Sequence, residues 1–360
     1  MAPDAPDLAH VRRVLVVKLR HHGDVLLSSP VFTVLKNRLP EAEIDALVYD
    51  DTREMLTLHP SIAQVHSVGR RWRALPLPAK LAAEWQLLSA LRARRYDLLV
   101  HLTEHPRGAW LSRILRVRYS VAPVVPGRSR WWNASFTHRY ALVRNSRRHT
   151  AESNLDALRR IGIAPTEDER RLQLVPGADA EATVGRLLAE RALETKRFVH
   201  LHPASRWLFK CWPAAENAAL IDRFHAAGWP VVVTAAPSPK EIDLVRAILS
   251  KTKAPVIDLS GKLSLKELAA LTARARLFVG VDSAPMHIAA AVGTPVVALF
   301  GPSSEIEWGP WEVPHRVIAS TRHPCRPCGL DGCGGGKVSE CLTSLPADTV
   351  WDAAREFLGV

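Results

Sequence analysis

The segment LFVGVDSAPMHIAAAVGTPVVALF, residues 277–300, decides the fold class. Two apolar runs, 277–281 and 295–300, enclose a stretch of small residues, 285–292, that has helical spacing. Apolar runs separated by a helix predict parallel strands that are buried on both faces of a sheet. The segment therefore indicates a strand–helix–strand unit of an α/β protein.

The same alternation extends over most of the chain. Further strands are predicted at 13–19, 43–48, 98–102, 198–202 and 231–235, and further helices at 25–38, 80–94, 214–227, 240–249, 264–274 and 348–358. This alternation of strands and helices begins near residue 11 and again near residue 196, and the polar, turn-rich segment 163–181 separates the two halves. We expect two doubly wound parallel-sheet domains, over residues 1–175 and 176–345, and a C-terminal helix in 346–360 that returns to the first domain. Such sheets bind ligands outside the carboxyl ends of their strands.

The positive charge is concentrated in the first part of the chain. Residues 1–150 contain 24 Lys and Arg against 12 Asp and Glu, whereas the other 210 residues contain 24 of each. Ten arginines lie between residues 107 and 148, with Trp131 and Trp132 among them. Such a surface attracts polyanions or an anionic membrane, unless it is only a solvated face. The two tryptophans could equally belong to the core.

Several classes of protein lose support. No apolar run approaches the roughly 18 residues of a membrane span, and the N-terminus lacks the pattern of a secretory signal. We therefore expect a cytoplasmic location. The chain has neither a Walker loop nor a dinucleotide-binding glycine motif, which argues against P-loop chemistry and hydride transfer.

The start of the helix inside the quoted segment is a candidate phosphate site. Ser283, Ala284 and Met286 are expected to present backbone amides there, with the helix dipole adding positive potential. His287 would face the same space. The alternative is an ordinary helix with Asp282 or Ser283 as its N-cap.

Two earlier loops also follow predicted strands. In 202–213, Ser205, Arg206 and Lys210 provide a hydroxyl and two cations, which suit a departing diphosphate, although a plain surface loop explains them too. Glu241 could accept a hydrogen bond from a ribose hydroxyl or simply occupy the first turn of its helix.

Three segments resemble glycosyltransferase family 9, the heptosyltransferases of bacterial lipopolysaccharide core assembly. VLVVKLRHHGDVLLSSPVFTVLKNRLPEAEID, residues 14–45, is similar to the opening motif, and FVGVDSAPMHIAAAVGTPVVALFGPSS, 278–304, to the nucleotide-sugar motif. The tail CRPCGLDGCGGGKVSECL, 325–342, resembles the heptosyltransferase III subgroup. The resemblance implies a GT-B fold, with two Rossmann-like domains and the active site between them.

The resemblance also implies a reaction. It is an inverting, metal-independent transfer from ADP-L-glycero-β-D-manno-heptose to an inner-core heptose, with no cofactor needed for catalysis. Asp24 matches the general base, for which a helix cap is the alternative, and Gly23 is expected to let the chain turn so that Asp24 projects. The implied donor-binding residues are Ser205, Arg206, Lys210, Glu241, Asp282, Ser283, Ala284 and His287.

The implied acceptor explains the basic first domain. The lipopolysaccharide inner core is anionic and lies at the cytoplasmic face of the inner membrane, so we expect peripheral contact with that face. The candidate acceptor-binding residues are Lys18, Arg20, His21, Arg128 and Arg130.

Four cysteines, Cys325, Cys328, Cys333 and Cys341, lie within 17 residues. The first two have zinc-like spacing, so the four thiolates could hold a structural zinc ion. The later spacing is irregular, and reduced free thiols or redox-labile pairs are the alternatives, since stable disulfides are not expected in a reducing cytoplasm.

Three other functions stay open from the sequence. The donor could be another nucleotide sugar, the basic half could bind nucleic acid, or the chain could be an inactive sugar-binding relative. Nucleic-acid binding is the remote alternative, because no helix-turn-helix, zinc finger or aromatic RNA-binding signature is present.

Overall fold

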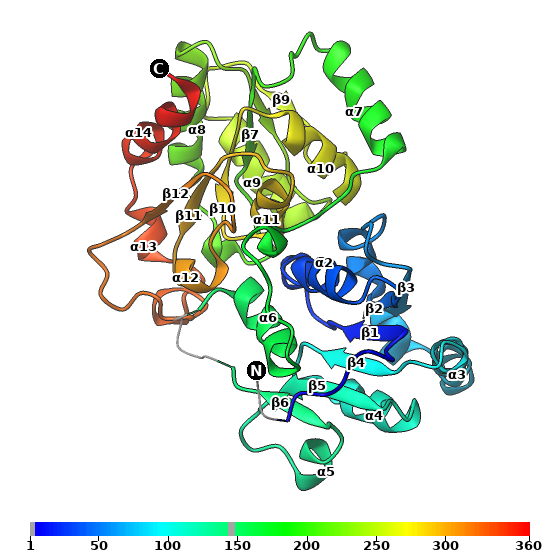
Figure 1. Cartoon of the computed structure of the whole chain (residues 1–360). Helices are drawn as coiled ribbons and strands as arrows, with labels where there is room; N and C mark the ends of the chain where they lie inside the picture. The colour runs from blue at the N-terminus through cyan, green and yellow to red at the C-terminus, as the bar shows by residue number, and fades with distance from the viewer. Residues whose placement is uncertain (1–3, 143–147) are drawn as a thin grey trace. The chain divides into compact units, whose positions relative to one another are not determined.

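The computed structural model describes residues 4–142 and 148–360. The chain divides between Leu174 and Val175 into two units, one residue from the expected boundary. Each unit contains a six-stranded sheet with helices on both faces (Figure 1). The expected α/β class, with two doubly wound parallel sheets, is confirmed.

The first unit has the strand order β3-β2-β1-β4-β5-β6, and every neighbouring pair is parallel. Its strands are β1 (Arg13–Val17), β2 (Glu43–Tyr49), β3 (Gln64–Val68), β4 (Leu98–His101), β5 (Tyr119–Pro123) and β6 (His138–Tyr140). Its helices are α1 (His22–Leu26), α2 (Ser29–Arg38), α3 (Leu77–Ala93), α4 (Arg107–Ile114), α5 (Arg130–Asn133) and α6 (Thr150–Arg160), with the 3₁₀ turns η1 (Asp50–Met55), η2 (Arg70–Ala74) and η3 (Asp168–Arg170).

The second unit repeats this topology as β12-β11-β10-β7-β8-β9, again all parallel. Its strands are β7 (Val199–His202), β8 (Val231–Val233), β9 (Ile257–Asp258), β10 (Leu277–Val281), β11 (Val296–Phe300) and β12 (His315–Ala319). Its helices are α7 (Ala178–Ala189), α8 (Ala214–Ala226), α9 (Pro239–Leu249), α10 (Leu265–Arg274), α11 (Ala284–Ala291), α12 (Glu305–Trp308), α13 (Glu340–Thr343) and α14 (Ala347–Leu358), with the 3₁₀ turns η4 (Leu208–Lys210) and η5 (Cys333–Gly335).

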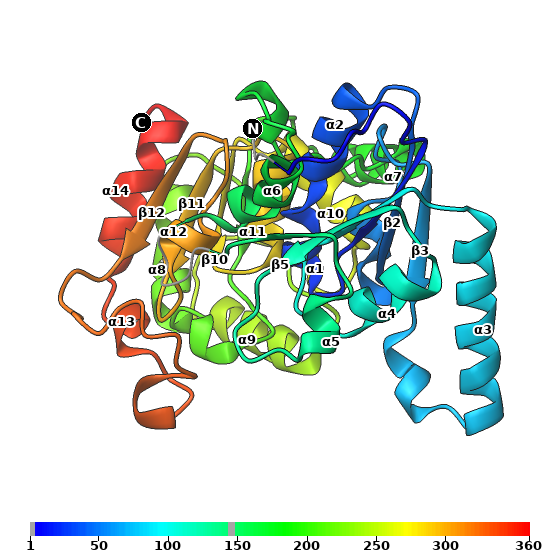
Figure 2. The same cartoon turned by 60° about the horizontal axis from the view of Figure 1, so that its bottom comes forward.

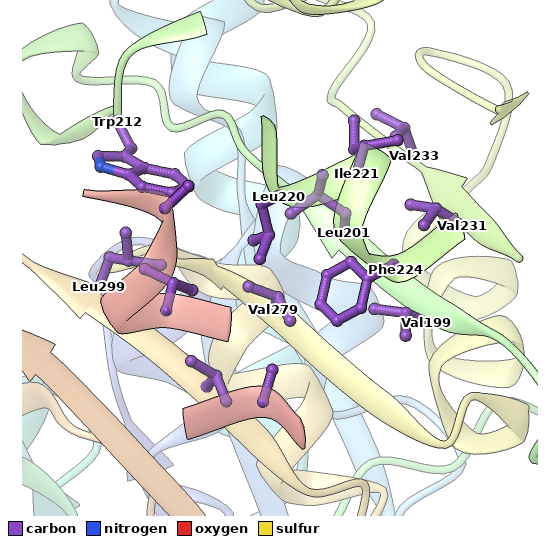
Figure 3. Packing of buried hydrophobic residues seen from close by; sticks show 14 of the residues in the cluster. Val199, Leu201, Trp212, Leu220, Ile221, Phe224, Val231, Val233, Val279 and Leu299 are labelled. Atoms are coloured by element: carbon purple, nitrogen blue, oxygen red, sulfur yellow. The ribbon is translucent and has the colours of Figure 1, made fainter. Parts of the chain in front are cut away.

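Buried apolar side chains fix the layers of the second unit. Figure 3 shows Val199, Val231 and Val279 of the sheet packed against Leu220, Ile221 and Phe224 of α8. On the opposite face, residues of α7 and α10 cover Phe198 and Val232. Both faces of the central strands are buried, which explains why they are mainly apolar, and the two polar side chains of β7, His200 and His202, each form a hydrogen bond with the Thr234 hydroxyl.

Two glycines allow the strand–helix–strand unit of the quoted segment to form. A Cβ atom at Gly280 of β10 would lie 2.8 Å from the His202 carbonyl oxygen, so only glycine permits this close approach. Gly293 follows α11 with φ of 74°, and the amide of Thr294 donates to the Ala289 carbonyl at 3.0 Å. A left-handed glycine at this place ends the helix and turns the chain into β11.

The last helix belongs to the second unit. Val350, Ala354 and Leu358 of α14 are buried in the core between the second sheet and α8, and the Ala347 amide donates to Glu216 Oε2 of α8 at 2.7 Å. The expectation that this helix returns to the first domain is wrong, because its apolar face is used to cover the second sheet.

Candidate active site

The donor candidates lie at the carboxyl ends of β7 and β10, which are neighbours in the second sheet. The strand order reverses between them, and such a switch point is where open α/β sheets bind ligands. Lys210 comes from the loop after β7, and Asp282 follows β10. Lys210 Nζ and Asp282 Oδ2 are 2.6 Å apart, so an ion pair spans the switch point.

The start of α11 borders the same ion pair. Ser283 occupies the N-cap position, but its hydroxyl donates to the Val281 carbonyl oxygen at 3.2 Å and does not cap the helix. The expectation for Met286 is wrong, because its amide donates to the Ser283 carbonyl oxygen at 3.2 Å. The amides of Ser283 and Ala284 have no acceptor among the described residues, so they remain available to an anion.

Glu241 joins the group from the start of α9. Its side chain is buried, and Oε2 accepts a hydrogen bond from the Ala236 amide at 3.2 Å. Burial raises the pKa of Glu241, while the Ala236 amide and then the positive charge of Arg206 oppose that rise. The charge of Arg206, in the loop after β7, therefore acts on Glu241, which follows β8.

The structure thus gathers the donor candidates at one end of the second sheet. Ser205 and His287 are buried there, whereas Arg206 is exposed. A hydroxyl, two cations and two amides can bind a diphosphate, and the carboxylates of Asp282 and Glu241 can accept hydrogen bonds from sugar hydroxyls.

The first unit has its own switch point, between β1 and β4. Lys18, directly after β1, is only 5% exposed. Its Nζ donates to the Leu102 carbonyl oxygen at 3.3 Å and to Asn154 Oδ1 at 2.9 Å. Lys18 was expected to bind the acceptor. Because its side chain is buried and already donates to two protein oxygens, it is better placed to provide a positive charge within the carboxyl end of the sheet.

Asp24 lies in the first turn of α1 and is half-buried. The N-cap position is His21, whose side chain is exposed and makes no capping hydrogen bond, so the reading of Asp24 as a helix cap fails. Gly23 lies within α1, and the expectation that it makes a sharp turn is wrong. The residues between β1 and α1 make the turn, and the Arg70 guanidinium fixes it by donating to the Arg20 carbonyl oxygen at 2.8 Å.

Asp24 and Lys18 interact electrostatically. Burial lowers the pKa of Lys18 to about 8, the Asp24 carboxylate partly offsets this, and Arg20 adds to the lowering. The interaction places a positive charge near the Asp24 carboxylate at neutral pH.

Lys18 gives a pH-dependent contribution to stability. In the unfolded chain its pKa is the ordinary 10.5, so between the two pKa values the unfolded state binds more protons and stability rises with pH. Relative to Lys18→Met, the wild type is expected to gain about 2 kcal/mol of unfolding free energy between pH 7 and pH 9.5. Urea unfolding at pH 7 and pH 9.5 measures the difference in unfolding free energy between the wild type and Lys18→Met. The same difference at both pH values would contradict the lowered pKa of Lys18.

Several arginines surround the loop after β4. The pKa of His105 is lowered first by burial and then by the charges of Arg107, Arg73, Arg20 and Arg128. Arg20 and Arg128 were named from the sequence as acceptor candidates, and Arg107 only as part of the arginine-rich stretch, whereas His105 and Arg73 were missed because they stand in no recognised motif. Basic composition was their only signal.

Arg128 is held in place by two contacts. It donates to the Glu104 carbonyl oxygen, and its guanidinium lies 4.8 Å from the ring centre of Trp132. Arg130 is the first residue of α5, and its side chain is exposed. Both alternatives for the two tryptophans occur: Trp132 is buried in the core, whereas Trp131 is exposed at the surface. Arg144 and Arg147 of the arginine-rich stretch lie outside the described residues.

The four cysteines of residues 325–341 differ in exposure. Cys325, Cys328 and Cys333 are exposed, Cys341 is buried, and all four are free thiols. In residues 4–142 and 148–360, no three His, Cys, Asp or Glu side chains are grouped as metal ligands. The geometry therefore gives no support to a structural zinc ion held by these thiolates. No helix in those same residues has the length and apolar character needed to cross a membrane.

Comparison with known proteins gives consistent findings. The model of the family described as glycosyltransferase family 9 (heptosyltransferase) matches residues 84–338. A lipopolysaccharide heptosyltransferase 3 of Escherichia coli is 37% identical over 295 residues, which cover 81% of this chain and 84% of that protein.

Solved structures resemble the whole chain. A glycosyl transferase family 9 structure from Veillonella parvula has a TM-score of 0.83 at 22% identity and covers 98% of this chain and 99% of that one. The E. coli heptosyltransferase WaaC with ADP-2-deoxy-2-fluoro heptose has a TM-score of 0.68 at 18% identity. The match covers 96% of this chain and 99% of the WaaC chain. Together with the two Rossmann-like sheets, these likenesses identify the expected GT-B fold.

Proposed function

Because this chain belongs to glycosyltransferase family 9, the heptosyltransferases, we propose that it transfers a heptose from ADP-heptose to the core of a lipopolysaccharide. The observation that carries the proposal is the Lys210–Asp282 ion pair at the switch point, beside the open amides of α11. The donor follows from relatives, since WaaC is seen with an ADP-heptose analogue.

The second unit binds the donor in this proposal. When the diphosphate arrives, Lys210 exchanges its contact with Asp282 for the phosphate oxygens, and Arg206, Ser205 and the Ser283 amide add further hydrogen bonds. Asp282 is then left to accept a hydrogen bond from a sugar hydroxyl. Positive charge at the phosphates stabilises the leaving ADP as its bond to the sugar breaks. These side chains supply the charge compensation, so the proposed step uses no metal ion and no cofactor.

The first unit supplies the base. The Asp24 carboxylate takes the proton of the acceptor hydroxyl while the hydroxyl oxygen bonds to the anomeric carbon. The bond from that carbon to the phosphate oxygen breaks on the opposite side, and its electron pair leaves with ADP. A single displacement of this kind inverts the anomeric configuration. The reaction requires the acceptor hydroxyl to be within reach of both Asp24 and the anomeric carbon.

The acceptor follows from charge and from the relatives. We assign an inner-core heptose, because the lipopolysaccharide heptosyltransferase 3 of E. coli is the relative at 37% identity. Arg20, Arg73, Arg107 and Arg128 provide cations for an acceptor that carries phosphates and acidic sugars. The proposal includes peripheral contact with the membrane that holds such an acceptor.

Calorimetric titration tests the donor assignment. ADP-heptose is expected to bind saturably, and ADP but not UDP or GDP is expected to compete. Equal competition by UDP or GDP would point to another nucleotide-sugar donor, and failure of every nucleotide to bind the folded protein would contradict the donor site.

Other functions have less support. Family membership argues against a nucleic-acid-binding protein. An inactive relative would have no need to keep Asp24 together with the full set of donor residues.

A further inference from the structure

Large apolar side chains of the first unit face the solvent on α3. Leu77, Leu81 and Trp85 follow one another at intervals of one helical turn, and Leu81 and Trp85 are 59% and 66% exposed. Leu87 and Leu91 are the residues of α3 that are buried. The apolar face of α3 is therefore wider than the part that the core covers. Figure 2 shows α3 beside α4 at one side of the first unit.

A groove of about 510 Å³ lies between α3 and α4. Its apolar wall consists of Leu81, Trp85, Leu88, Trp110, Leu111 and Ile114. Arg107 donates hydrogen bonds of 2.6 and 2.7 Å to the two carboxylate oxygens of Glu84. This ion pair links the two helices and neutralises the carboxylate at the groove.

The apolar surface continues onto α5. Trp110 is 56% exposed, and its ring centre lies 4.6 Å from that of the exposed Trp131. The Arg113 guanidinium lies 5.2 Å from the ring centre of Trp131. Three of the four most exposed tryptophans among the described residues thus belong to one surface.

Cations border this surface. His105 lines the groove, and the charges of Arg107, Arg73, Arg20 and Arg128 act on it. Arg113 and Arg130 are exposed on the helices that carry Trp110 and Trp131. The result is an aromatic and aliphatic patch with a cationic border.

We propose that this docking surface, formed by α3, α4 and α5 and centred on Trp85 and Trp110, binds an anionic lipid bilayer. Leucine and tryptophan side chains enter the boundary between head groups and acyl chains, the depth that tryptophan favours. The exposed Arg113 and Arg130 at the border pair with lipid phosphates, each strengthening binding about fivefold. The inference deepens the proposed function and rests on it for its purpose, since it brings the enzyme to a membrane-anchored acceptor.

Other occupants fit this surface less well. A second copy of the chain would bring two cationic borders together, and like charges across an interface are unfavourable.

Flotation of the full chain with vesicles tests the proposal. One set of vesicles contains phosphatidylglycerol and phosphatidylethanolamine, the other phosphatidylcholine alone, and neither contains nucleotide or lipopolysaccharide. The double variant Leu81→Gln/Trp85→Gln is compared with Leu330→Gln, which changes a leucine of the second unit with similar exposure, 58%. Because all three side chains are exposed, the thermal melts are expected to match that of the wild type.

The wild type and Leu330→Gln are expected to bind the anionic vesicles equally, and the double variant about tenfold or more weakly. Weak binding of the wild type to phosphatidylcholine is expected as well. Equal binding of the double variant, or no binding of the wild type to anionic vesicles at low salt, would overturn the inference. If the wild type did not bind vesicles but associated with itself, and the double variant did not, the occupant of the surface would be a second copy of the chain and the bilayer proposal would be wrong. The donor titration is independent of these outcomes. Failure of vesicle binding would remove the membrane contact but leave the proposed transfer reaction standing, whereas failure of the donor titration would contradict the transfer reaction without changing the vesicle result.

Discussion

Replacing Asp24 by Asn is expected to lower the rate of heptose transfer by a factor of about 10² to 10⁴, with donor affinity unchanged. An amide has the same shape as the carboxylate but cannot take the proton of the acceptor hydroxyl. Asp24 is half-buried in the first turn of α1, and asparagine has the same size, so the variant is expected to fold normally. Release of ADP under single-turnover conditions measures the rate, and calorimetry measures the affinity.

Asp179→Asn is the matched control for Asp24→Asn. Asp179 is also an aspartate in the first turn of a helix, α7, but it is exposed and belongs to the second unit. It should turn over at the wild-type rate. Turnover of Asp24→Asn close to the wild-type rate would show that another group acts as the base.

Replacing Lys210 by Met is expected to weaken the binding of ADP-heptose and of ADP by about 10- to 100-fold. The ammonium that would contact the diphosphate is lost, and a hydrogen bond to a charged group contributes about 1.5–3 kcal/mol. Asp282 also loses its partner at 2.6 Å, which leaves a nearly buried carboxylate uncompensated beside the donor phosphates. Titration with each nucleotide measures the change.

Lys251→Met separates this effect from a general loss of positive charge. Lys251 is exposed at the end of α9, in the same unit but away from the loops that follow β7 and β10. Its nucleotide affinity should equal that of the wild type. If Lys210→Met kept full affinity for ADP, the assignment of Lys210 to the phosphates would be wrong.

Most central strands could be predicted from the sequence because they consist mainly of apolar residues. β10 has the bounds expected for it, Leu277–Val281, since both its faces are buried. The four edge strands, β3, β6, β9 and β12, were missed, and so was the interior strand β5. β3 contains Gln64, His66 and Ser67 and is mostly half-exposed, and β9 has two residues. Neither has the continuous apolar run that signals a buried strand.

The helix expected at 25–38 is in fact two helices. α1 ends at Leu26, and α2 begins at Ser29 with Pro30 in its first turn. A proline has no amide hydrogen to donate and fits best at the start of a helix, so the sequence did contain the signal for this break.

The composition of the candidate site could be predicted, but its contacts could not. Lys210 and Asp282 are 72 residues apart, and only the strand order of the second sheet brings them together. The burial of Lys18 depends in the same way on Asn154, which lies 136 residues further along the chain. Such contacts follow from topology rather than from local pattern.

Heptose transfer is measured most directly by incubating the purified protein with ADP-heptose and a lipopolysaccharide acceptor that lacks the heptose to be added to its inner-core heptose. Mass spectrometry is expected to find the acceptor heavier by one heptose, with one ADP released per heptose transferred, and to find far less of this product with Asp24→Asn. An acceptor of unchanged mass, with a protein that is folded and binds ADP-heptose, would contradict the proposed transfer.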